Sequence, residues 1–201
     1  MEQSIPTSNK YLHSIIRILI VAILYFILGK FAFVISVSNN IVTNAPFFAE
    51  GIGLAATILF GYVNAIGIFI GQFVLAITSG VDLTSSIWIS LVNSLLAIVG
   101  SYLFNKFKFG KSLLGFKNIL LLSTLILLVV QPLSAILGNF ILHGFEKIDA
   151  EFFWISAVTW WLGNSIGQLV LVPMLLLSFT KKFKLRNLLF KDIPVAFIAF
   201  L

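Results

Sequence analysis

The side chains best suited to binding a ligand are the few polar ones that lie inside long apolar runs. Trp160, Asn164 and Gln168 are spaced four residues apart, so on a helix they share one face. An aromatic ring in line with two amides could face a polar cavity. The simpler alternative is hydrogen bonding between helices, worth about 1 kcal/mol per contact. Gln72 and Asn93 allow the same two interpretations.

Two charged residues in apolar surroundings extend this set. Lys30 lies inside the first apolar run, about 12 Å from its outer end at about 1.5 Å per helical residue. Its side chain either reaches outward along its own stem or pairs with Glu50. Glu50 begins the next run near the outer surface, where the free N–H groups of a helix start favour a carboxylate. We therefore expect a small-ligand pocket that opens on the outer side and is formed by Lys30, Glu50, Gln72, Trp160, Trp161, Asn164 and Gln168.

No group of residues has the composition of a catalytic centre, so we do not expect an enzyme. The chain has no cysteine, and His13 and His143 lie far apart in sequence, so neither a metal site nor a cofactor is predicted. The net charge of +6 comes largely from Lys and Arg in short loops beside apolar runs. This placement is typical of membrane topology and not of nucleic-acid binding.

Composition indicates the elements that must position these residues. The chain is 60% hydrophobic and 10% charged, with mean hydropathy +1.10, whereas soluble domains are about 45–50% apolar and about 25% charged. We expect an all-α integral membrane protein, with residues 1–201 forming a single membrane-embedded domain and no soluble domain. The polytopic helical bundle would have six complete spans plus the start of a seventh. The predicted spans are 15–38, 47–61, 63–79, 87–104, 119–142, 152–179 and the incomplete 193–201.

The distribution of charge decides how the region 47–79 is divided. A single span there would place the loop with Lys106, Lys108 and Lys111 outside, whereas two short spans turning near 61–64 place it inside. With two spans, every Lys and Arg except Lys30 and Lys147 is cytoplasmic. The expected location is therefore a bacterial inner membrane, with a cytoplasmic N-terminus.

Glycines predict where helices approach closely. Gly67 and Gly71, and again Gly163 and Gly167, form G-x-x-x-G motifs, and Gly51 is a further packing candidate. The match between the two copies extends through Gln72-x-Val-Leu and Gln168-x-Val-Leu in spans of opposite direction, which suggests an inverted three-plus-three repeat. Kinks are expected inside two runs, at Pro132 and Pro173.

Three segments together resemble a known family. They are Tyr25-Phe-Ile-Leu-Gly-Lys30, Pro46-x-x-x-Glu50-Gly-Ile-Gly-Leu-Ala-Ala56 running on to Gly67-Ile-Phe-Ile-Gly71, and Trp160-Trp-Leu-Gly-Asn-Ser-Ile-Gly-Gln-Leu-Val-Leu-Val-Pro173. In this order and spacing they resemble the first class of membrane-associated sensor domains, the MASE family of bacterial signalling proteins. Phe47 and Phe48 depart from the family's usual Trp-Pro entry. Asn164 stands where the family often has aspartate, which removes a carboxylate.

The resemblance implies a sensory input domain that detects a small ligand or a membrane state within the lipid bilayer. Its output would be a cytoplasmic cyclase, phosphodiesterase or kinase module, in cis or in trans. Because the sequence stops at Leu201 inside an apolar run, we expect a truncated product. One alternative is a substrate-capture component of a small-solute transporter, and another is an inert remnant.

Overall fold

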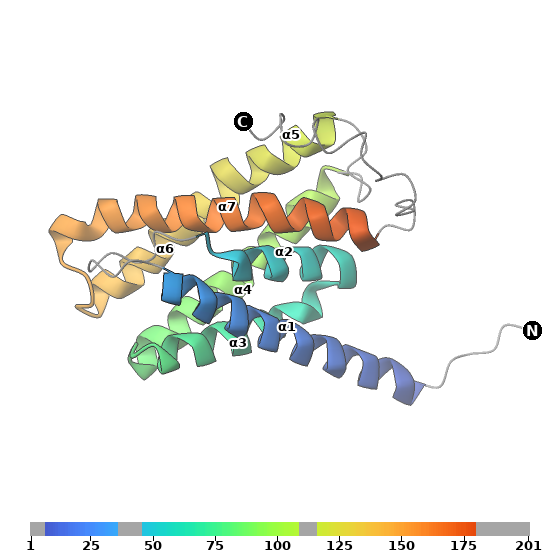
Figure 1. Ribbon diagram of the computed structural model, residues 1–201, viewed down its shortest axis with the longest axis horizontal. Coiled ribbons are helices and arrows are strands. Elements are labelled where there is room, and N and C mark those ends of the chain that lie inside the picture. Colours follow the sequence, from blue (N-terminus) through green and yellow to red (C-terminus); the bar gives the residue numbers. More distant parts are fainter. Residues whose placement is uncertain (1–6, 36–45, 109–115, 180–201) are drawn as a thin grey trace, which may run out of the picture.

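The computed structural model describes residues 7–35, 46–108 and 116–179, and every regular element among them is helical. Figure 1 shows the helices arranged as a bundle. In chain order they are α1 (Thr7–Ile35), α2 (Phe48–Phe60), the 3₁₀ turn η1 (Tyr62–Asn64), α3 (Ala65–Thr78), α4 (Leu83–Lys106), α5 (Phe116–Leu125), the π-helical η2 (Ile126–Val130), α6 (Gln131–Gly144), the 3₁₀ turn η3 (Ala150–Phe152) and α7 (Phe153–Phe179).

Four helical stretches of the described chain are long and apolar enough to cross a membrane. They are Tyr11–Phe33, Leu83–Lys106, Lys117–Gly144 and Ala150–Phe179. The predicted spans 47–61 and 63–79 correspond to the shorter apolar helices α2 and α3, of 13 and 14 residues. The apolar run 193–201 lies outside the described residues. The described chain is therefore all-helical with four helices that are long and apolar enough to span a membrane, and the count of six spans stays a prediction.

The chain turns between α2 and α3 at Gly61. This glycine has φ +94°, a backbone conformation that side chains with a Cβ rarely adopt. Its N–H donates to the Thr57 carbonyl at 3.1 Å, which closes the last turn of α2. The 3₁₀ turn η1 then leads directly into α3, so the two short helices α2 and α3 are separated in sequence by only a few residues.

The surface of the bundle is apolar, and polar side chains are buried among the apolar clusters of its interior. Large apolar side chains cover the outside, including Leu128 and Trp154 with about two thirds of their area exposed (69% and 68%). Amides, hydroxyls and one carboxylate are buried inside, among them Glu50, Asn93, Gln131 and Gln168. An apolar exterior, with polar groups kept inside the bundle, suits lipid as the surrounding solvent.

Two interfaces built on glycine hold the bundle together. In the α1–α3 interface, a Cβ on Gly67 would lie 2.5 Å from the Ile18 carbonyl oxygen, and one on Gly71 would lie 2.7 Å from that of Ala22. In the α2–α7 interface, a Cβ on Gly51 would lie 2.6 Å from the Gly167 carbonyl oxygen. Both pairs run parallel, and only glycine permits such close approach.

The repeated glycine motif in the sequence is not matched by a repeat in how the helices pack. In an inverted repeat of two three-helix halves, α3 and α7 would be equivalent, as would α1 and α4. Gly67 and Gly71 on α3 face α1, whereas α7 packs mainly on α2 and α6. The two copies of the motif therefore receive helices that are not equivalent to each other.

The kink expected at Pro132 takes the form of a π-helical turn. Proline has no N–H and crowds the carbonyl four residues earlier, and η2 immediately precedes this residue. The indole N–H of Trp161 donates to the carbonyl of Leu127 within η2 at 2.9 Å. Helix α7 thereby supplies a hydrogen bond to the irregular turn. Pro173 lies inside α7, which continues past it to Phe179.

Candidate functional site

Helix α2 begins halfway through the bundle. The N–H of Phe47 donates to the Gly163 carbonyl at 2.9 Å, and a Cβ on Gly167 would overlap the Phe47 carbonyl. Gly163 and Gly167 lie near the middle of α7. The non-helical residue Phe47 therefore lies against bare α7 backbone near the middle of that helix, where α2 begins in Figure 1. Glu50 follows in the first turn of α2.

The prediction that Glu50 lies near the outer surface is wrong. Glu50 is 3% exposed, and its hydrogen-bonding neighbours come from the central parts of α1 and α7. The sequence predicted a short span that begins near the outer surface, but glycines on α7 allow the start of α2 to enter the bundle interior. The site is therefore internal and does not open directly on the outer side.

Glu50 is the centre of a polar network that joins several helices. The Tyr25 hydroxyl on α1 donates to Glu50 Oε1 at 2.5 Å, with the tyrosine fully buried. Asn93 on α4 is a second hydrogen-bonding neighbour of the Tyr25 side chain. The Ser134 hydroxyl on α6 donates to Asn93 Oδ1 at 3.2 Å. These contacts connect α6, α4, α1 and α2 in sequence.

Gln168 adds α7 to this network. Its amide nitrogen lies 3.5 Å from the backbone carbonyl oxygen of Glu50, at the long limit of a hydrogen bond. The side chain is fully buried, and its Oε1 has no hydrogen-bond partner. Gln131 on α6 is also fully buried, with neither side-chain polar atom partnered. The interior thus holds unused donors and acceptors, which are costly unless water or a ligand satisfies them.

Lys30 does not pair with Glu50. Its ammonium donates to the Thr78 carbonyl at 2.8 Å and to the Ser79 hydroxyl at 3.1 Å. These groups lie at the C-terminus of α3, where unpaired carbonyls and the helix dipole favour a cation. The alternative in which the side chain reaches outward along its stem is closer to the structure. A pocket built from Lys30 and Glu50 together is not formed.

The aromatic members of the predicted pocket pack helices together. Trp160 is 7% exposed and lies against Gly138 of α6, where a Cβ would come within 2.6 Å of its ring. Trp161 hydrogen bonds to η2, as described above. Asn164 is buried on α7, and Gln72 is buried on α3 with its Oε1 unpartnered. Of the predicted residues, the structure brings Glu50 and Gln168 together.

Sequence reasoning missed Tyr25 and Ser134. Both lie within apolar runs, where a buried hydroxyl needs a hydrogen-bond partner. That requirement is the signal that could have identified Tyr25, which begins one of the segments quoted above. Asn93 was recognised as a hydrogen-bonding amide, but its partners on α1 and α6 could not be predicted.

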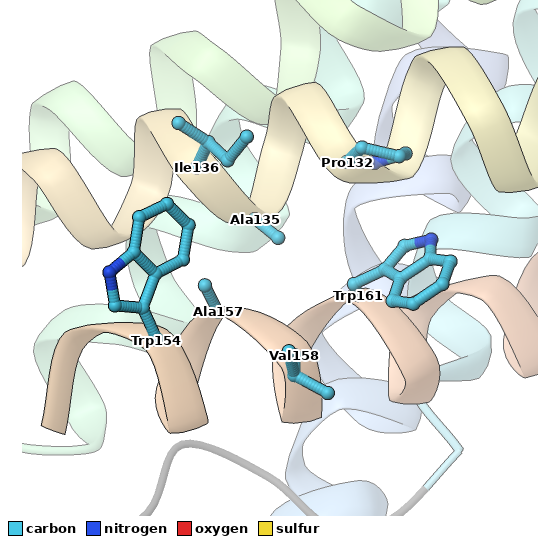
Figure 2. Close-up of a pocket in the computed structure, with 7 residues that line it drawn as sticks. All are labelled: Pro132, Ala135, Ile136, Trp154, Ala157, Val158 and Trp161. Carbon is cyan, nitrogen blue, oxygen red and sulfur yellow. The ribbon is translucent and has the colours of Figure 1, made fainter.

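An apolar groove of about 140 Å³ lies apart from this network, between α6 and α7. Figure 2 shows the rings of Trp154 and Trp161 at its two ends, with small apolar side chains between them. The residues that line it are Pro132, Ala135, Ile136, Trp154, Ala157, Val158 and Trp161. Lacking polar groups, this groove suits hydrocarbon and not a polar ligand.

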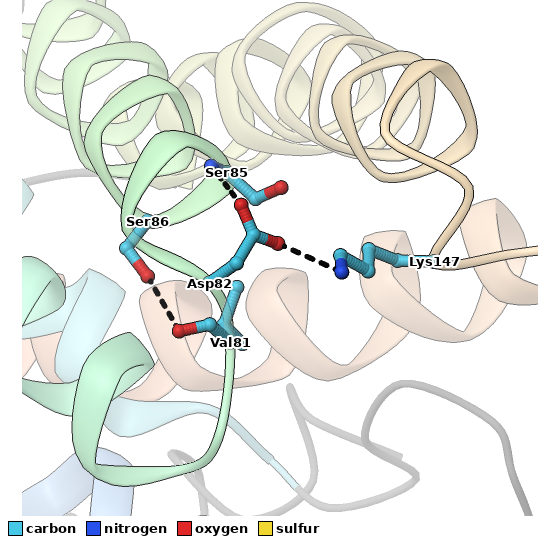
Figure 3. A network of polar contacts seen from close by, with 5 residues as sticks. All are labelled: Val81, Asp82, Ser85, Ser86 and Lys147. Atoms are coloured by element: carbon cyan, nitrogen blue, oxygen red, sulfur yellow. Dashed lines mark hydrogen bonds and ion pairs between the residues drawn. The ribbon is translucent and has the colours of Figure 1, made fainter.

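A separate ion pair joins two loops at one end of the bundle (Figure 3). Asp82 caps α4 by accepting a hydrogen bond from the Ser85 N–H at 3.0 Å, and it pairs with Lys147 at 3.1 Å. The Ser85 hydrogen bond, assisted by Lys147, lowers the pKa of Asp82 to about 2. Both side chains are well exposed, so the pair contributes little to stability.

The fold and the buried network define a multi-pass membrane protein whose polar interior links its helices. The model of the MASE1 family matches residues 13–190, and the chain belongs to this family of membrane-embedded sensory domains of signalling proteins. No curated protein and no solved structure matches the chain.

Proposed function

We propose that this chain is the sensory input domain of a bacterial signalling protein and that the Glu50 network is its sensing site. The observation that carries the proposal is a buried carboxylate at mid-depth whose contacts reach α1, α2, α4, α6 and α7. A small ligand or a membrane state that changes these contacts would alter the packing of five helices together. Such coupling requires that the stimulus bind two packings with different affinity.

The output would pass to a cytoplasmic cyclase, phosphodiesterase or kinase module, in cis or in trans. Family membership and the absence of any predicted catalytic group support an input role and not an enzymatic one. Phe60 at the end of α2 contacts the guanidinium of Arg17 on α1 and the ring of Phe179 on α7. This junction connects the network helices at the end we assign to the cytoplasm.

The proposed topology has six spans in the inner membrane with a cytoplasmic N-terminus. Thirteen residues of α2 rise about 20 Å, enough to reach one surface from mid-depth. The chain has no cysteine, so single-cysteine variants carry one reactive thiol each. Lys106→Cys should react with a membrane-impermeant maleimide only from the cytoplasm, and Lys147→Cys only from the periplasm. The reverse pattern, or both on one side, would rule out this topology.

The sensing role is tested through the output of the full-length protein in its own cells. Tyr25→Phe removes one hydroxyl from the network and should shift the effector's activity at unchanged membrane levels. Ile70→Leu, on the half-exposed side of α3, is the matched control and should leave the output unchanged. Output identical to wild type in both Tyr25→Phe and Glu50→Gln would refute a sensing site here.

One observation favours the alternative role in solute capture. Helices that begin at mid-depth, as α2 does, also build the substrate sites of several transporters. If the chain captures a solute, substituting Trp160 and Asn164 should abolish uptake in cells, whereas a sensor would show unchanged uptake and altered effector output.

A further inference from the structure

Glu50 is the one acidic residue that the described ranges place in the interior. The other described acidic residues, Asp82, Glu146, Asp149 and Glu151, belong to the loops at one end of the bundle and to η3. An isolated carboxylate in an apolar medium is costly unless a cation pairs with it or a proton neutralises it. The first question is therefore whether any neighbouring helix supplies a cation.

Among the side chains that the structure describes, no positive one on the helices packed against α2 is placed next to Glu50. On α1, Lys30 binds the end of α3, and Arg17 binds the His13 carbonyl and the Ser14 hydroxyl. On α4, Lys106 lies over the ring of Tyr102 at the opposite end from Asp82. Helices α3 and α7 carry no ionisable side chain, and Tyr62 of η1 is exposed. Tyr25 is the titratable group that faces Glu50.

The surroundings of Glu50 can satisfy both charge states. The Tyr25 hydroxyl and the N-terminal turn of α2 favour the carboxylate. The neutral acid instead has an O–H that needs an acceptor. Gln168 is the candidate acceptor, because its fully buried Oε1 is unpartnered and its amide nitrogen lies 3.5 Å from the Glu50 backbone carbonyl oxygen.

We infer that Glu50 is a proton-binding site inside the membrane and that its ligand is the proton itself. The carboxylate accepts a proton from hydronium: one O–H bond of hydronium breaks, one O–H bond forms on the carboxylate, and a neutral acid and a water molecule result. The Tyr25 hydroxyl continues to donate to Oε1, and the new O–H donates to Gln168 Oε1. Neutralisation removes the attraction between the Glu50 charge and the N-terminus of α2. This weakens the electrostatic stabilisation of the first turn of α2, which contacts α7.

The proton would be the stimulus of the proposed sensor. Only its role as a signal rests on the proposed function; the binding of the proton to Glu50 does not. The binding event is tested chemically, without any effector. If Glu50 binds protons but output never responds, the sensing proposal fails alone. If output responds to network variants but Glu50 binds no proton, this inference fails alone.

The test uses dicyclohexylcarbodiimide, an apolar reagent that modifies carboxyl groups in their protonated form, on the full chain in liposomes. Mass spectrometry of the peptide that contains Glu50 measures the adduct across a pH series. We expect labelling that falls about tenfold per pH unit above its midpoint, is absent in Glu50→Gln and is unchanged in Asp82→Asn. Tyr25→Phe and Gln168→Leu should displace the profile along the pH axis, because each removes a partner of one charge state.

A second readout does not depend on reagent access. The infrared carboxylic-acid C=O band of the wild type should titrate over the same pH range and be missing from Glu50→Gln. Absence of both adduct and band would overturn the inference, as would labelling that does not vary with pH. Protection by sodium at constant pH would also overturn it, because a metal cation and not the proton would then occupy the site.

Discussion

The α1–α3 and α2–α7 interfaces both contain the G-x-x-x-G motif, but the motif has a different role in each. In the first, Gly67 and Gly71 face carbonyls deep inside the regular helix α1. In the second, Gly167 faces the non-helical residue Phe47, just before α2 begins. The first interface packs two helices along their length, whereas the second admits a chain end into the interior. The motif therefore determines close approach, and the element opposite determines what the approach achieves.

The glutamines that follow the two motifs show the same contrast. Gln72 follows Gly71 on α3 and is buried with its Oε1 unpartnered. Gln168 occupies the equivalent place in the other copy and lies against Glu50. Equivalent positions thus have different chemistry, because only the α2–α7 interface contains a helix start and a carboxylate.

The largest effect that separates the two interfaces is expected from Gly167→Ala. The new methyl would overlap the backbone of Phe47 and Phe48, which the Gly163 hydrogen bond holds in place. We expect a loss of about 3 kcal/mol in the free energy of unfolding, at the upper end for overpacking. Gly71→Ala meets the helix α1 and should cost about 1–2 kcal/mol, because two regular helices can separate slightly.

Unfolding in mixed detergent micelles measures both variants. Gly144→Ala is the control, because a Cβ there has no atom within 4 Å and should leave stability unchanged or slightly raised. Equal losses for Gly167→Ala and Gly71→Ala would mean that the start of α2 moves as easily as a helix does.

Tyr25 connects the two interfaces and gives the next largest effect. A Cβ on Gly71 would lie 2.8 Å from its Cβ, its ring lies edge-on to Phe47, and its hydroxyl donates to Glu50. Tyr25→Phe should cost about 2 kcal/mol, the value of a hydrogen bond to a charged or strongly polar acceptor. In a double-mutant cycle with Glu50→Gln, the coupling energy should be about 1–2 kcal/mol. A coupling near zero would show that the hydroxyl contributes nothing through Glu50.

How much of this arrangement was predictable depends on how local the interaction is. Periodicity along one helix placed Trp160, Asn164 and Gln168 on one face, and all three are buried on α7. Composition predicted an all-helical membrane protein, and the motifs predicted the family. The all-helical membrane fold and the family are confirmed, whereas the six spans stay a prediction. These signals are carried by neighbouring residues and need no knowledge of the partner helix.

Contacts between distant segments were predicted poorly for a physical reason. The pairing of Lys30 with Glu50 assumed that α2 begins at the membrane surface. Its depth is instead set by Phe47 docking on Gly163, a contact between residues more than a hundred positions apart. Tyr25 joined Glu50 because that docking brought the carboxylate to mid-depth, so one tertiary contact decided both outcomes.

The contrast between Gln72 and Gln168 predicts a difference in stability that is smaller than the one expected for Tyr25→Phe. Gln168→Leu should destabilise the protein by about 1 kcal/mol, because it removes a polar contact at the start of α2. Gln72→Leu should be neutral or slightly stabilising, because it removes an unpartnered buried polar atom. The measurement is again detergent unfolding. A larger loss in Gln72→Leu than in Gln168→Leu would reverse the assignment of roles.

The smallest effect is expected outside both interfaces, at the exposed Asp82–Lys147 pair. The pKa of Asp82, about 2 in the folded protein, lies below its ordinary value of about 4. Its contribution to stability is therefore complete above about pH 4 and is lost as the pH falls towards 2. Asp82→Asn should lower the melting temperature slightly at neutral pH, and the difference from wild type should vanish in acid. Lys147→Met should keep most of this pH dependence, because the Ser85 N–H is the larger cause of the shift. If Lys147→Met instead abolished it, the ion pair and not the helix cap would hold the loop between α3 and α4.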